Sequence, residues 1–191
     1  MISHSHKFIF IPVRRAAGTS IATAMGDYGE KGFDRGVLTH NWYSDIEKYR
    51  DYFVFTAIRN PWDRLVSGYF WSNKSERYSG KQVNFEEFVN NLPTKESNYK
   101  WWFHTARTLT EMLIDCDGRF IADFTIRFEN LKADFKTVCK KLNLDRLVLP
   151  HKGRTNHKHY SMYYNPKTRD AVAKRFKPDI DYFGYKFKQG K

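Results

Sequence analysis

FIFIPVRRAAGTSIATAM, residues 8–25, opens with six apolar residues from Phe8 to Val13. An apolar run of this length predicts a strand that is buried on both faces. The cationic and small residues RRAAGTS follow at 14–20, and Ile21–Met25 then predicts the start of a helix. A strand, a loop with hydroxyl groups and a helix start can together hold a phosphate-like anion. An ordinary strand–turn–helix with solvated arginines explains this stretch equally well.

The length and composition of the chain indicate one folded domain. Of its 191 residues, 41% are hydrophobic and 17% aromatic, which is not the composition of a disordered protein. We therefore expect a single domain over residues 1–191. No apolar run approaches the roughly 20 residues of a membrane span, and the first predicted strand starts too early to leave room for a signal peptide. These features predict a soluble, cytoplasmic protein.

The charge of the chain indicates an anionic partner. It has 33 Lys and Arg against 21 Asp and Glu, a formal net charge of +12. Such an excess attracts anions without distinguishing nucleic acid, acidic glycans, phosphorylated cofactors and membrane surfaces. The two cysteines, Cys116 and Cys139, lack the spacing of metal ligands, and we expect both to be reduced and buried.

A second stretch repeats the arrangement of the first. Residues 52–58 predict another buried strand, and Arg59 follows it directly. A helix start is well specified after it, with Asn60 as N-cap and Pro61 at the first helical position. On this helix Ser67 follows Arg59 by eight residues. The guanidinium and the hydroxyl can therefore bind a second anion.

The remaining elements alternate in type along the chain. Further predicted elements are a strand at about 120–128 and helices at 44–49, 85–92, 131–142 and 166–177. Alternating strands and helices predict an α/β fold with a central parallel sheet flanked by helices. Because ligands of such sheets lie at the carboxyl ends of the strands, we expect Arg14, Arg15 and Arg59 on one edge.

The first loop does not have the spacing of a Walker A motif, which disfavours a nucleotide kinase. Instead, Ala17-Gly18-Thr19-Ser20 resembles the 5′-phosphosulfate loop of sulfotransferases that use PAPS (3′-phosphoadenosine 5′-phosphosulfate). Residues 58–67, IRNPWDRLVS, resemble their 3′-phosphate motif. The nearest branch is the carbohydrate sulfotransferases, which act on chondroitin, dermatan or heparan. Further similarity lies at 117–118, 127–131, 149–151 and 182–185, in the same order, so the resemblance spans nearly the whole chain and implies a P-loop-like fold.

The resemblance implies roles for matched residues. Arg59 and Ser67 would hold the 3′-phosphate of PAPS. The 5′-phosphosulfate would lie on the first loop, whose matched residues are Ala17, Gly18, Thr19 and Ser20. Arg15 occupies the position where the family usually has a Lys that stabilises the leaving group, and Arg14 is an alternative for this role.

The resemblance also implies a general base and a second basic segment. His40 precedes the helix that leads to the second strand, and a neutral imidazole suits removal of the acceptor proton. Without the resemblance, a solvated loop histidine is the better interpretation. Lys152 and Arg154 belong to a basic segment that resembles the one folding over the cofactor. His157 and His159 have no third ligand at a standard spacing, so we expect no metal.

The sequence thus predicts a PAPS-dependent O-sulfotransferase acting on a saccharide or other hydroxyl-bearing acceptor, with neither a nucleic-acid partner nor a membrane span. The net charge favours an acidic acceptor, and loops at 27–38, 73–83 and 99–104 are candidates to bind it. In the last loop, Trp101 and Trp102 suit either the core or stacking on sugars. The alternative is a non-enzymatic basic module for polyanions or nucleic acid, which the charge alone permits.

Overall fold

A computed structural model describes residues 1–29, 49–74, 83–93, 103–115, 117–144, 147–153 and 155–190. These residues group into two compact units. Unit 1 comprises Met1–Ile58 and Leu113–Gly153, and unit 2 comprises Arg59–Met112 and Arg154–Lys191. The single domain expected over residues 1–191 stays a prediction. Most of the helix expected at 44–49 and of the acceptor loops expected at 27–38, 73–83 and 99–104 lies outside the described residues, which omit 30–48, 75–82 and 94–102.

Unit 1 is built on a four-stranded sheet in the order β1-β2-β3-β4. Its strands are β1 (Ile2–Ser3), β2 (Phe8–Ile11), β3 (Phe53–Ile58) and β4 (Phe124–Arg127). Strands β2, β3 and β4 are parallel, with Phe8 opposite Phe53 and Phe55 opposite Phe124. The α/β class with a mainly parallel sheet is therefore confirmed.

The core of unit 1 lies where the two predicted apolar runs pair. All four residues of β2 are buried, as are the last four of β3. Phe10 stacks on Phe55 with ring centroids 5.1 Å apart. The buried Thr56 satisfies its hydroxyl by donating to the Ile11 carbonyl at 2.9 Å. Both strands are thus held in register up to their carboxyl ends, which lie at the same edge of the sheet.

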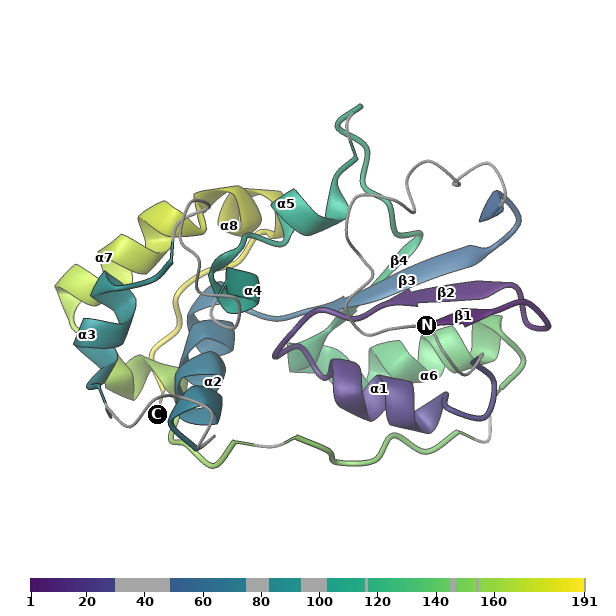
Figure 1. The fold of residues 1–191 in the computed structure, drawn as a ribbon, viewed down its shortest axis with the longest axis horizontal. Coiled ribbons are helices and arrows are strands. Elements are labelled where there is room, and N and C mark those ends of the chain that lie inside the picture. Colours follow the sequence, from purple (N-terminus) through teal and green to yellow (C-terminus); the bar gives the residue numbers. More distant parts are fainter. Residues whose placement is uncertain are drawn as a thin grey trace. The chain divides into compact units, whose positions relative to one another are not determined.

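Two helices run alongside this sheet in Figure 1, α1 (Gly18–Ala24) and α6 (Leu131–Lys141). Helix α6 packs against β4 and buries Phe135, Val138 and Cys139, so the expected burial of that cysteine is confirmed; Cys116 lies outside the described residues. A 3-10 turn, η2 (Phe128–Asn130), joins β4 to α6.

The sheet differs from the prediction at both edges. The polar N-terminus contributes an antiparallel strand, β1, through pairing of Ile2 with Ile9. The third predicted strand is shorter than expected, because Phe120 forms only an isolated bridge with Ile114 and regular pairing starts at Phe124. Both differences depend on which strand each segment pairs with, and strand propensity alone does not determine this.

Unit 2 contains helices around an aromatic core. They are α2 (Pro61–Lys74), α3 (Phe85–Asn90), α4 (Phe103–Ala106), η3 (Tyr160–Tyr163), α7 (Pro166–Arg175) and α8 (Lys177–Phe183); α5 (Thr110–Leu113) ends at the unit boundary. The buried residues of this core are Trp62, Leu65, Val66, Phe85, Phe88, Val89, Tyr160, Val172 and Phe176. Helix α8 was not predicted, whereas α2, α3, α6 and α7 lie where the sequence expects helices.

Asparagine caps fix the starts of three of these helices, as the sequence predicts for Asn60. The Asn60 side chain accepts from the Trp62 N–H at 3.1 Å, and Asn84 accepts from Glu87 at 2.9 Å. Asn165 forms a capping box with Thr168 at the start of α7. Because each cap satisfies an N–H that the helix cannot, each sets where its helix begins.

Candidate functional site

The loop between β2 and α1 has an unusual backbone. Arg15 and Ala17 have φ angles of 65° and 62°, in the left-handed region that favours glycine. Such strained positions gather at functional sites. Gly18 then starts the right-handed helix α1, so a left-handed residue is followed directly by right-handed backbone. This alternation is typical of concave sites whose N–H groups bind anions.

The same loop is tightly packed and free of acidic residues. A Cβ at Gly18 would lie 3.3 Å from both the Pro12 Cβ and the Val13 carbonyl oxygen, so the chain passes too closely there for a larger residue to fit easily. Ser20 is buried, whereas Arg14 and Thr19 are exposed. The first turn of α1 carries no acidic side chain that would repel an anion.

The basic segment at 150–153 is bonded to this loop. The Ser20 hydroxyl donates to the Lys152 carbonyl at 3.2 Å and accepts from the Lys152 N–H at 3.1 Å. The Arg15 guanidinium donates to the Gly153 carbonyl at 3.4 Å. Three of the predicted site residues, Arg15, Ser20 and Lys152, therefore lie together in unit 1.

The second candidate site lies at the start of α2 in unit 2. Arg59 directly follows β3 in the chain, and its side chain is only 8% exposed. Its Nε donates to the Asp63 carboxylate at 2.8 Å, one turn further along α2. This pair fixes the direction of a nearly buried guanidinium at the position where the sequence predicts an anion.

Ser67 contacts a residue that the sequence analysis missed. Ser67 is 1% exposed, and its hydroxyl lies 3.2 Å from the Thr155 hydroxyl. Thr155 follows the predicted Arg154, and no local pattern singles it out. The predicted basic segment is divided between the units, with Lys152 in unit 1 and Thr155 in unit 2.

Other predicted site residues have no described position. His40 and Arg154 lie outside the described residues, as do Trp101 and Trp102. His157 stacks on Phe70 with ring centroids 5.5 Å apart, and His159 lies beside the Ser161 hydroxyl at 2.9 Å. Over the described part of the chain, no cluster of His, Cys, Asp or Glu could hold a metal ion. None of the described helices is both long and apolar enough to span a bilayer.

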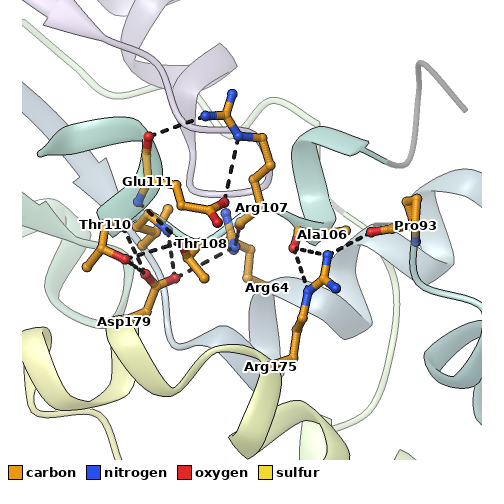
Figure 2. A network of polar contacts seen from close by, with 10 residues as sticks. Arg64, Pro93, Ala106, Arg107, Thr108, Thr110, Glu111, Arg175 and Asp179 are labelled. Carbon is orange, nitrogen blue, oxygen red and sulfur yellow. Dashed lines mark hydrogen bonds and ion pairs between the residues drawn. The ribbon is translucent and has the colours of Figure 1, made fainter. Parts of the chain in front are cut away.

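A buried ion pair in unit 2 was also missed. Arg64 and Asp179 are both 0% exposed, and the Arg64 Nη2 lies 4.0 Å from the carboxylate (Figure 2). Asp179 accepts the backbone N–H groups of Leu109 and Thr110 at 2.7 and 2.9 Å. Arg64 donates to the Arg107 carbonyl at 2.6 Å. Burial raises the pKa of Asp179, and the nearby Arg64 and these hydrogen bonds partly oppose that rise.

Comparison with known proteins assigns the family. The sequence model of the sulfotransferase family matches residues 1–186. The chain belongs to the sulfotransferase family. This sulfotransferase is also 31% identical over 94 residues to a protein of Archaeoglobus fulgidus described as an uncharacterized protein; the match covers 49% of this chain and 69% of that relative. No solved structure matches it. The family agrees with the α/β fold and supports sulfuryl transfer in general.

Proposed function

We propose that this sulfotransferase moves a sulfuryl group from PAPS to a hydroxyl of a saccharide or related acceptor. One observation carries the proposal. The parallel strands β2 and β3 end at the same edge of the sheet, and each is followed in the chain by a cationic segment and a helix. PAPS carries two anionic groups, the 3′-phosphate and the 5′-phosphosulfate, and so matches two such segments.

The residues of each segment fit one anionic group. The left-handed loop at 15–17 and the Gly18 start of α1 suit the 5′-phosphosulfate, because backbone N–H groups gather there without acidic neighbours. The fixed Arg59 guanidinium and the buried Ser67 hydroxyl suit the 3′-phosphate, because Arg binds phosphate through its planar fork. PAPS supplies the sulfuryl group and leaves as 3′-phosphoadenosine 5′-phosphate (PAP).

The chain itself supplies charge and a proton acceptor. Arg15, or Arg14 in its place, balances the negative charge that develops on the leaving oxygen. Arg15 differs from the usual Lys because its charge is spread over a planar fork. His40 takes the proton of the acceptor hydroxyl as that oxygen bonds to sulfur. No metal ion is required, because positioning and electrostatic stabilisation suffice for such a transfer.

The proposal is tested by PAP binding and by sulfuryl transfer from labelled PAPS to a glycan panel. Arg59→Ala weakens PAP binding by about 10- to 100-fold, the loss expected for a charge-assisted hydrogen bond. The matched control is Arg119→Ala, an exposed arginine in the turn before β4, which leaves binding unchanged. Wild-type protein that neither binds PAP nor transfers sulfate contradicts the proposal.

His40→Ala separates chemistry from binding. It lowers the transfer rate by about 10²- to 10⁴-fold, the usual contribution of a general base, while PAP affinity stays within error. In the wild type the rate rises with pH as the histidine loses its proton and can accept one from the hydroxyl. Loss of PAP binding in this variant would refute the assignment of the base. Salt-sensitive binding of nucleic acid that is equally strong in the wild type and in Arg59→Ala would instead favour the non-enzymatic module.

A further inference from the structure

The Ser20 hydroxyl is already committed to protein partners. A serine hydroxyl has one hydrogen to donate and two lone pairs that can accept. Here its hydrogen is directed at the Lys152 carbonyl, and one lone pair accepts the Lys152 N–H. While both bonds are present, the hydroxyl has no hydrogen left for an anion. An anion needs donors, so the Ser20 side chain cannot serve it directly in this arrangement.

The same two bonds fix a cationic residue. Ser20 is 5% exposed on the first turn of α1, whereas Lys152 is exposed. The Lys152 N–H also donates to the Pro150 carbonyl at 3.1 Å, and Gly153 turns the chain with a φ of 67°. The Arg15 guanidinium holds the Gly153 carbonyl. The segment 150–153 is therefore a tight turn whose backbone is bonded to the anion loop at consecutive residues.

We propose that Ser20 is a positioning residue that acts through Lys152: its hydroxyl holds the Lys152 backbone, and with it the start of a cationic side chain, next to the phosphosulfate loop. This inference rests on the proposed function and differs from direct binding of PAPS by the Ser20 hydroxyl. On this inference, Ser20 raises the affinity for an anion only by ordering the backbone of residues 150–153.

The first test is hydrogen exchange of the Lys152 amide in the free protein. Ser20→Ala speeds this exchange because the amide loses one of its two acceptors, and Ser20→Thr restores the slow exchange because it keeps a hydroxyl. The matched control is Thr23→Ala, which removes from the same helix a hydroxyl that bonds only within α1, to the Thr19 carbonyl at 2.8 Å. Unchanged exchange in Ser20→Ala overturns the inference.

The second test is a double-mutant cycle on PAP binding. Ser20→Ala weakens binding by about 2- to 10-fold, as expected when one neutral hydrogen bond that orders Lys152 is lost. If Ser20 acts through Lys152, then Ser20→Ala causes no further loss in a chain that already carries Lys152→Ala. If the losses of PAP affinity in the two single variants add up in the double variant, Ser20 contacts the anion directly. That result overturns this inference but not the proposed function. Failure of the wild type to bind PAP overturns the proposed function and this assignment together, while the exchange test still decides whether Ser20 holds the turn.

Discussion

Arg15 and Ala17 hold left-handed backbone although neither is glycine. For residues with a Cβ this conformation costs roughly 1–2 kcal/mol, so surrounding contacts must maintain it. The Arg15 side chain bonds the Gly153 carbonyl, and Ala17 is followed at once by the crowded Gly18. The loop is thus held in one shape before any anion arrives, which lowers the entropic cost of binding.

Ala17→Gly tests this strain. Glycine accepts a φ of 62° without a steric penalty, so the variant gains about 1 kcal/mol in the free energy of unfolding. The neighbouring Ala16 is buried and does not share the left-handed conformation, so Ala16→Gly lowers the stability by about 1 kcal/mol. Chemical denaturation of both variants provides the comparison. Equal losses in the two variants would mean that the loop stores no strain.

At the residue scale, the sequence identified groups but not their partners. Arg15, Ser20 and Lys152 were each predicted, and the structure brings them together. The use of the Ser20 hydroxyl on the Lys152 backbone was not predictable, because it joins residues 132 positions apart. Asp179 escaped notice for a related reason. An aspartate in a polar sequence is ordinarily exposed, and only the fold pairs it with Arg64.

At the scale of elements, the Arg64–Asp179 pair joins three parts of unit 2. Arg64 lies on α2, Asp179 on α8, and the Asp179 carboxylate receives the backbone N–H groups that open α5. The Arg64 Nη1 finds no partner among the described residues, so the charge of this arginine depends on Asp179. Removing one member of a buried pair leaves an uncompensated charge.

Asp179→Asn lowers the free energy of unfolding by about 1–3 kcal/mol, because the amide offers one acceptor oxygen where the two carboxylate oxygens receive the backbone N–H groups of Leu109 and Thr110. The control is Asp181→Asn on the same helix, where the exposed carboxylate pairs only with Lys177 at 2.6 Å and contributes little. Denaturant unfolding at pH 7 measures both. Equal, small losses in the two variants would contradict the role of the buried pair.

The pH dependence of this variant follows from the raised pKa of Asp179. The folded chain holds a proton on this carboxyl more tightly than the unfolded chain, whose pKa is near 4. The contribution of Asp179 to stability therefore grows as pH falls through the raised pKa towards 4. The stability gap between wild type and Asp179→Asn should widen on acidification over this window. A gap that narrows would mean that the folded-state pKa is lowered instead.

The elements themselves were largely readable from the sequence. Continuous apolar runs marked β2 and β3, and the Asn60 cap marked the start of α2. Strand β1 has two residues and exists only by pairing with β2. Helix α8 has only seven residues, which is too few to show a clear helical periodicity. Elements that depend on tertiary contacts rather than on local pattern were the ones missed.

At the scale of the whole molecule, the chain crosses between units at residues 58–59, 112–113 and 153–154. Each unit is therefore assembled from two separate pieces of chain, and neither piece contains a complete unit. From this interleaving we expect the two units to unfold together, and the single domain expected from the length stays a prediction.

Native-state hydrogen exchange tests this cooperativity. If residues 1–191 unfold as one domain, Asp179→Asn lowers the free energy of exchange for the slowest amides of β2 and β3 by the same amount as for those of α2. Cooperative coupling requires this because the substitution lies in unit 2 and the strands lie in unit 1. Loss of protection restricted to α2 and its neighbours would show two domains.

The Arg175 guanidinium donates to the Pro93 carbonyl at 2.7 Å and to the Ala106 carbonyl at 3.3 Å (Figure 2). One side chain on α7 therefore joins the two ends of the segment between residues 93 and 106, and it does so through backbone atoms alone. Side-chain identity within that segment does not enter these bonds. In protein engineering this is a grafting position, because a foreign loop can be inserted between two ends whose separation is already fixed. The entropic cost of closing such a loop grows only slowly with the length of the inserted loop. Libraries of loop sequences can be built there while Arg175 is kept.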